Sequence, residues 1–393
     1  MSLCLLVALP GLSLDICLAA VPAIGRELET NAEGAAGVLN LFAFVFGLGH
    51  LIAGWVSDRY GRRTPLLVGL GGYTFGALVG AISPTIEILY YARTIQGLAA
   101  SMVVVSGISI ARDKFTGKEL AQVLARVGAI AALGPVVVPV VGAVVLDFWG
   151  WRMLFYLLAL YGAGVGGWFF LKGPKQEPGF VKESFLESLS NLAGIMRTRV
   201  FIRFCFVHSA AFCGLFAYLV HGSILMLESY GASAQAMSFW LGANALVFAL
   251  SSYFTSGWIA HFSTERLVLF GTVLLLVGGL LMFSFAGVGA CWAFCVPMFV
   301  VTAGVGILLP VSSACAVLPF ATTAGRAVSL LGAIRFGLGS LTCWLLLGSA
   351  SAAAIAGLIV ACAVVVFLTC VLFSETNSVG VWPASASSAA LNE

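Results

Sequence analysis

The stretch Gly54-Trp-Val-Ser-Asp58-Arg59-Tyr-Gly61-Arg62-Arg63 is a short charged turn between two long apolar runs. It stands out because only 9% of the 393 residues are charged. The glycines allow two helix ends to turn tightly and to approach each other closely. Asp58 can accept a hydrogen bond from a helix N-terminus or from an arginine, and the three arginines favour an anionic membrane face. The turn therefore predicts a junction between two membrane helices.

The composition around this turn excludes a water-soluble globular protein. The chain is 61% hydrophobic with a mean hydropathy of +1.08, which leaves too few polar residues to cover a globule. Runs of about 20 apolar residues are long enough to cross a hydrocarbon core of about 30 Å. Twelve such runs are expected at residues 3–24, 36–56, 65–84, 87–111, 119–146, 152–171, 200–226, 235–260, 266–286, 291–317, 325–348 and 351–373.

The fold class that follows is an all-α polytopic membrane protein with 12 transmembrane helices in two pseudo-symmetric six-helix bundles. We expect the first bundle at 1–171, a cytoplasmic linker at 172–199, the second bundle at 200–373 and a cytoplasmic tail at 374–393. The linker contains the helix breakers Gly173-Pro174 and Pro178-Gly179, followed by an amphipathic stretch at 180–195 that suits a membrane surface. The two halves repeat weakly, since a Gly-Trp pair follows both the second and the eighth run.

Basic residues predict the orientation. If the Arg59 turn is cytoplasmic, most of the 19 basic residues fall in inner loops, and the outer loops hold only Arg26 and Arg152. Both termini are then cytoplasmic. The first run lacks a clear cleavage site, so we expect a retained helix and no signal peptide.

The chemistry-bearing residues do not form an enzyme site. The ten cysteines are scattered through the apolar runs, and no metal-ligand spacing or disulfide framework is visible. No nucleophile–base pair is visible either. The sequence predicts no enzyme, no cofactor and no metal.

Asp15 lies within the first apolar run, where a charge is costly. It must face a partner or a wet cavity, and it shares a helix face with the small residues Gly11 and Ala19. A role in function is therefore expected. The alternative is an aspartate that only pins its helix through a hydrogen bond.

Arg93 in the fourth run is the expected partner of Asp15. Counted from the outer helix ends, Asp15 lies about 13 Å deep and Arg93 about 9 Å deep, so their side chains are expected to meet. Gln96 continues the Arg93 stripe and is a candidate for substrate binding. A purely structural salt bridge is the alternative.

The fifth run carries a stripe of small residues and prolines. Ala125, Gly128, Ala132, Pro135, Pro139 and Gly142 advance by 3, 4, 3, 4 and 3 positions, which places them on one helix face. Such a face allows another helix to pack closely.

The second half offers three candidate substrate contacts, His221, Asn244 and Arg335. His221, like His208, could line a cavity, with a packing histidine as the alternative reading. Arg335 lies near the midplane of its run, and no acid in the helices of this half is available to neutralise it. We therefore expect it to face a cavity or to snorkel toward the interface.

Several of these segments together resemble the major facilitator superfamily. The G-x-x-x-D-R-x-G-R-R pattern of the Gly54–Arg63 turn is similar to the loop between its second and third helices. Arg93-Thr-Ile-Gln96-Gly97 resembles the R-x-x-Q-G motif of proton-coupled members, and Gly134, Pro135, Pro139 and Gly142 resemble the helix-packing "antiporter" motif of drug–proton exporters, with Val138 in place of its second glycine.

The resemblance extends over nearly the whole chain to the Bcr/CflA branch, which exports drugs and related small molecules in exchange for protons. It implies proton coupling at Asp15 and Arg93. It implies gating by Gly54, Asp58, Arg59, Gly61, Arg62, Arg63, Arg112 and Asp113. Two departures are Ala19, where a proline is usual, and Arg335, where a neutral polar residue such as glutamine is usual.

The expected function is proton-coupled export of antibiotics and other drugs through a bacterial cytoplasmic (inner) membrane. One alternative is export of an anionic metabolite such as a carboxylate siderophore, and a more distant one is a membrane sensor that has lost transport. The expected partners are a small-molecule substrate, protons and the lipid bilayer, with no nucleic acid. We expect the protein to be a monomer.

Overall fold

The computed structural model describes residues 2–115, 117–173, 184–259, 261–320, 323–347 and 351–373. For residues 2, 117–118, 120–122, 124–126, 128–133, 135–136, 185 and 234 it describes the backbone only. The predicted tail at 374–393 and the first part of the predicted linker helix, 180–183, lie outside the described residues.

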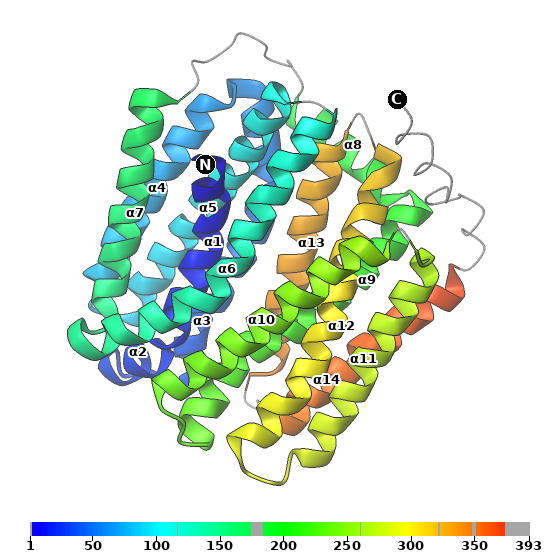
Figure 1. The fold of residues 1–393 in the computed structure, drawn as a ribbon. Coiled ribbons are helices and arrows are strands. Elements are labelled where there is room, and N and C mark those ends of the chain that lie inside the picture. Colours follow the sequence, from blue (N-terminus) through cyan, green and yellow to red (C-terminus); the bar gives the residue numbers. More distant parts are fainter. Residues whose placement is uncertain are drawn as a thin grey trace.

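The described residues are helical almost throughout (Figure 1). The first half contains α1 (Ser2–Leu18), α2 (Val21–Glu27), α3 (Ala32–Tyr60), α4 (Arg63–Ala81), α5 (Ile86–Lys114), α6 (Gly117–Trp149) and α7 (Trp151–Lys172). A short helix, α8 (Phe185–Met196), precedes the second half. That half contains α9 (Arg199–Ala217) with two π-helical turns, η1 (Tyr218–Gly222) and η2 (Leu225–Ser229), then α10 (Ala234–Trp258), α11 (Thr264–Phe285), α12 (Cys291–Val317), the 3-10 turn η3 (Leu318–Phe320), α13 (Ala324–Leu345) and α14 (Ala352–Leu372).

Each of the twelve predicted apolar runs coincides with a helix or a broken helix. Within the described part of the chain, ten helices are long and apolar enough to cross a membrane, and the bent pair formed by α1 and α2 makes eleven. Helix α6 covers the remaining predicted run at 119–146. The predicted all-α polytopic fold is confirmed.

The first run differs from its prediction, because 3–24 is not one continuous helix. It breaks after Leu18, and α2 continues at 61° to the first segment. Pro22 stands in the first turn of α2 and has no backbone N–H to donate to the preceding turn. The break is therefore encoded locally.

The two halves lie side by side (Figure 1), and they meet along two helix pairs, α3 with α13 and α6 with α10. A Cβ placed on Gly47 of α3 would lie 2.9 Å from the Phe336 Cβ, so this glycine brings α3 and α13 into close contact. On the other pair, Ser238 Oγ donates to the Pro139 carbonyl at 3.1 Å. These pairs form the main contacts between the two halves in the described part of the chain.

Helix α8 begins with a capping box. The Ser184 side chain accepts from the Glu187 backbone N–H, and the Glu187 carboxylate accepts from the Ser184 N–H at 2.7 Å. The helix lies at the end of the bundle where the Asp58 turn also lies (Figure 1). Leu186 and Leu189 are exposed on it, which fits the amphipathic helix predicted for the linker.

Candidate functional site

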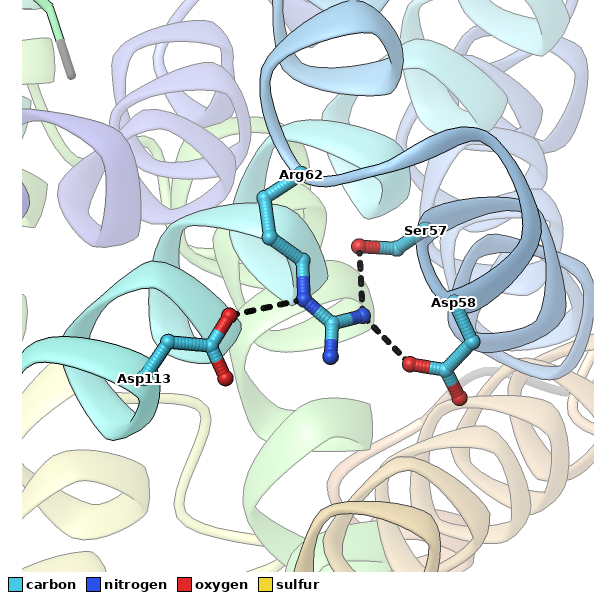
Figure 2. A network of polar contacts seen from close by, with 4 residues as sticks. All are labelled: Ser57, Asp58, Arg62 and Asp113. Atoms are coloured by element: carbon cyan, nitrogen blue, oxygen red, sulfur yellow. Dashed lines mark hydrogen bonds and ion pairs between the residues drawn. The ribbon is translucent and has the colours of Figure 1, made fainter. Parts of the chain in front are cut away.

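The charged turn is organised around the Arg62 guanidinium (Figure 2). Arg62 Nε donates to Asp113 Oδ2 at 3.0 Å, and Nη1 donates to Ser57 Oγ at 3.3 Å and pairs with Asp58 Oδ1. Partial burial would lower the pKa of Arg62, but its bonds to Asp58 and Asp113 outweigh burial and raise it. Arg62 therefore ties the end of α3 to the end of α5.

The rest of the turn shows why it is compact. Gly61 has a φ of 79°, a backbone conformation that favours glycine. Arg63 Nη2 donates to the Phe170 carbonyl at 2.8 Å, and the Arg59 guanidinium lies 5.5 Å from the Trp55 ring centre. The expectation of a close helix approach at Gly54 is wrong, since a Cβ there would meet no described atom within 4 Å.

Gly54 instead faces a cavity of about 550 Å³ between the two halves. Its walls come from α3, α5, α8 and the first turns of α13. The predicted gating residues Gly54, Asp58, Arg62, Arg112 and Asp113 all line it, and the other lining residues include His50, Trp55, Val104, Val105, Ile108, Ser188, Leu192, Gly325, Arg326, Val328 and Ser329. The Arg112 guanidinium lies against Gly325, so a first-half arginine touches the second half here.

Asp15 is buried, with 6% of its surface exposed. Its Oδ2 has no hydrogen-bond partner among the described residues. The nearby position Gly11 leaves space beside this oxygen, since a Cβ there would lie 3.9 Å from it. The structure thus contains a buried carboxyl oxygen on α1 without a partner among the described residues, an uncommon and costly arrangement.

Arg93 is fully buried but does not pair with Asp15, so the predicted contact is wrong. Its Nε donates to the Val38 carbonyl at 3.1 Å and its Nη2 to the Ser13 carbonyl at 2.9 Å. The guanidinium carbon lies 4.7 Å from the Phe42 ring centre. On a helix of 3.6 residues per turn, Asp15 points away from the face on which Arg93 is bound.

Gln96 lies beside Arg93, as the shared stripe predicted. Its Oε1 accepts from Arg93 Nη1 at 3.3 Å, and its Nε2 is buried without a partner among the described residues. The side chain packs against Gly76, where a Cβ would lie 2.9 Å from the Gln96 Cγ. Gln96 does not line the described cavity.

The described end of the α6 stripe, Pro139 and Gly142, lies against other helices. A Cβ on Gly142 would lie 2.7 Å from the Ile16 carbonyl oxygen of α1, and Pro139 accepts a bond from α10. At Gly134 a Cβ would meet no described atom within 4 Å. The Pro135 side chain lies outside the described residues.

His221 and Asn244 are bound within the second half. His221, in η1, donates from Nε2 to the Cys343 carbonyl at 2.9 Å. Asn244 donates to the Tyr218 hydroxyl at 3.0 Å and accepts from Thr302 Oγ1 at 3.0 Å. Neither lines the described cavity, so their contacts fit packing roles.

Arg335 neither lines the described cavity nor snorkels, contrary to expectation. Its guanidinium carbon lies 5.0 Å from the Phe212 ring centre and 4.5 Å from that of Phe336. Nη1 donates to His208 Nε2 at 3.5 Å, and His208 Nδ1 donates to Ser312 Oγ at 3.0 Å. Two aromatic faces and the His208 ring thus take the place of the missing acid beside Arg335.

His50 is the cavity residue that the sequence reasoning missed. It lies on α3 at four-residue steps from Gly54 and Asp58, so the three share one helix face. This four-residue spacing is visible in the sequence and could have indicated that His50 lies on the same side of the helix as Asp58. Among the described residues, no group of three or more His, Cys, Asp or Glu side chains is placed to hold a metal ion.

Comparison with solved structures supports this architecture. A POT family transporter solved in complex with 5-aminolevulinic acid superimposes with a TM-score of 0.78, covering 96% of each chain at 13% sequence identity. At that identity the likeness speaks for the fold alone.

Relatives with known names indicate the branch of the superfamily that the chain resembles. An uncharacterised MFS-type transporter of Bacillus subtilis, YdgK, is 29% identical over 86% of this chain and 85% of its own. A bicyclomycin resistance protein homolog of Haemophilus influenzae is 24% identical (87% and 86% covered), and multidrug resistance protein D of Escherichia coli is 25% identical (85% and 84% covered). These relatives confirm the resemblance to the Bcr/CflA branch.

The model of the Major Facilitator Superfamily matches residues 3–342, which is most of the chain. The chain belongs to the Major Facilitator Superfamily.

Proposed function

We propose that this protein is a secondary transporter that exports small molecules, chiefly antibiotics and other drugs, in exchange for protons. Support comes from the family and from relatives named for resistance to bicyclomycin, to chloramphenicol and to multiple drugs. The observation that carries the proposal is the cavity of about 550 Å³ between the two halves, which is within the size range of small-molecule sites.

Asp15 is the proposed proton carrier. A buried carboxyl group with an unpartnered oxygen can bind a proton without breaking an existing bond. Arg93 has a different proposed part, because it binds two carbonyls and an amide oxygen. It holds α1 in place, and it influences Asp15 through the position of that helix.

The Arg62 network and Arg112 are the proposed gate at the Asp58 end of the cavity. By the distribution of basic residues, this end faces the cytoplasm, as do both termini, in a bacterial inner membrane. The proposed units are the bundles at 1–171 and 200–373, joined by the linker at 172–199 and acting as a monomer.

Export of an anionic metabolite is not favoured. That alternative depended on Arg335 and Arg93 facing one cavity, and both guanidinium groups are bound elsewhere. A transport-dead sensor is not favoured either, since Asp15, the Asp58 turn and Arg93 are all present.

The test is transport by the purified full chain in inside-out vesicles. A panel of cationic, neutral and anionic drugs is added to vesicles with an imposed proton gradient, and proton release and drug uptake are recorded together. Uptake of at least one drug with matching proton release is expected. Vesicles without the protein are the control, and uptake equal to that control for every compound would contradict the proposal.

A further inference from the structure

His50 is a cavity side chain that has no part in the proton transfer or gating proposed above. It is 8% exposed and lines the cavity on the same face of α3 as Gly54 and Asp58. Eight residues separate it from Asp58, which places it about 12 Å deeper along the helix. His50 therefore lies at the inner end of the cavity, away from the charged turn.

Several apolar side chains line the cavity near His50. Val104 and Val105 of α5 and Val328 of α13 line the same cavity. From the other half, Gly332 faces the ring, and a Cβ there would lie 3.4 Å from the His50 Cδ2. A polar atom in an apolar pocket fixes the orientation in which a largely apolar molecule binds.

The hydrogen bonding of His50 fixes which nitrogen is free. Nδ1 lies 2.7 Å from the Phe46 carbonyl oxygen, which can only accept, so Nδ1 carries the hydrogen. The ring is held edge-on against the Phe46 ring, with centres 4.5 Å apart at 89°. In the neutral ring, Nε2 is then a hydrogen-bond acceptor with no described partner in the protein.

A positively charged side chain lies close to this end of the cavity. The Arg335 guanidinium of α13 lies over the Phe336 ring, and Phe336 packs against Phe46, the ring that also contacts His50. A second positive charge beside this guanidinium would be repelled. A carboxylate, in turn, would place its own lone pairs against that of Nε2.

We propose that His50 Nε2 is a substrate-recognition acceptor at the inner end of the cavity and that it selects uncharged cargo carrying a hydroxyl or amide N–H. This inference rests on the proposed export function and narrows its substrate class. The cargo donates one hydrogen bond to Nε2, and its apolar part packs among the valines of α5 and α13.

The test is equilibrium binding to the full chain in detergent, with two labelled probes. Chloramphenicol is uncharged and carries hydroxyl and amide N–H donors, whereas tetraphenylphosphonium is a cation with no donor. His50→Phe keeps a ring against Phe46 and removes the acceptor, and His50→Gln keeps an acceptor at similar reach. His261→Phe, at an exposed histidine beyond α10, is the matched control.

His50→Phe should raise the Kd for chloramphenicol about tenfold, the effect of one lost hydrogen bond. His50→Gln should stay within about threefold of the parent chain, and His261→Phe should equal it. Binding of tetraphenylphosphonium should not weaken in His50→Phe. Equal chloramphenicol binding in His50→Phe and the parent, or an equal loss for both probes, would overturn the assignment.

Vesicle transport separates this inference from the proposed function. If the chain exports tetraphenylphosphonium but no uncharged compound, drug export stands and the role of His50 falls. If it exports neither class, the export function fails and the role of His50 fails with it.

Discussion

Arg93 donates from Nη2 to the carbonyl oxygen of Ser13 at 2.9 Å, and this bond fixes α1 so that Asp15 points elsewhere. Asp15 and Arg93 are matched in depth, but Asp15 lies on a different face of α1 from the Ser13 carbonyl that Arg93 of α5 binds. The two residues also differ in their hydrogen bonding, because Arg93 donates to backbone carbonyls and one carboxyl oxygen of Asp15 has no partner among the described residues. The two residues can therefore be tested independently.

Asp15→Asn should abolish proton-driven export and leave the protein folded. The amide keeps the shape of the carboxyl group but cannot bind or release a proton near neutral pH. Drug uptake is measured in inside-out vesicles with and without a proton gradient, at matched protein levels. Gradient-dependent uptake like that of the parent chain would remove Asp15 from the mechanism.

Arg93→Lys should destabilise the protein while the charge is retained. One ammonium group cannot reproduce the fork that reaches both the Val38 and Ser13 carbonyls, and a buried carbonyl without its bond costs about 1–3 kcal/mol. Thermal unfolding in detergent is the measurement, with Arg26→Lys in the exposed end of α2 as the control. A midpoint unchanged from the parent would show that a point charge is sufficient at this position.

Asp58→Asn should loosen the end of the cavity that we assign to the cytoplasm. Arg62 loses one carboxylate and keeps Asp113, and because the paired side chains are 30% and 28% exposed, the loss is worth at most about 1 kcal/mol. That energy corresponds to a population shift of about fivefold. The shift should open this end more often.

The measurement is labelling of Ser329→Cys, a position in the cavity wall, with a charged maleimide. Labelling should speed up about fivefold when Asp58→Asn is added. Glu87→Gln, at an exposed acid in the first turn of α5, is the matched control. Identical labelling rates with and without Asp58→Asn would show that this acid does not hold the end closed.

Two glycines of α6 give a matched pair for helix packing. Gly142→Ala should destabilise the protein by about 1–3 kcal/mol, because the new Cβ would lie 2.7 Å from the Ile16 carbonyl oxygen. Gly134→Ala meets no described atom within 4 Å and should stabilise the helix by about 0.5–1 kcal/mol. Thermal unfolding should move in opposite directions for the two variants, and equal shifts would contradict the packing role of the stripe.

The helices were predictable from sequence because each one is marked by a long apolar run of consecutive residues. An apolar run of about 20 residues must become a helix in lipid, whatever surrounds it. The Gly61 turn and the Asp58–Arg62 pair were also predictable, since their residues are neighbours in the chain. Interactions between neighbouring residues were sufficient to predict this turn.

The site was less predictable because it depends on rotation about helix axes. Depth along an axis placed Asp15 and Arg93 at similar levels but did not say which way each faces. For Arg335, the helices of the second half offer no carboxylate partner, and the structure supplies His208 and two aromatic rings in its place. His50 shares a face with Asp58, a periodicity visible in the sequence once Asp58 is known to line a cavity.

The two π-helical turns after α9 have a consequence for any positional scan of this segment. Each widened turn changes the angular step between successive side chains, so the face assigned to residues before Tyr218 does not continue past it. A tryptophan scan along the segment should show tolerance repeating at the α-helical period through Ala217 and drifting out of phase from Tyr218 to Ser229. The positions that tolerate substitution should therefore follow one periodicity before Tyr218 and another after it, and His221 belongs to the second group.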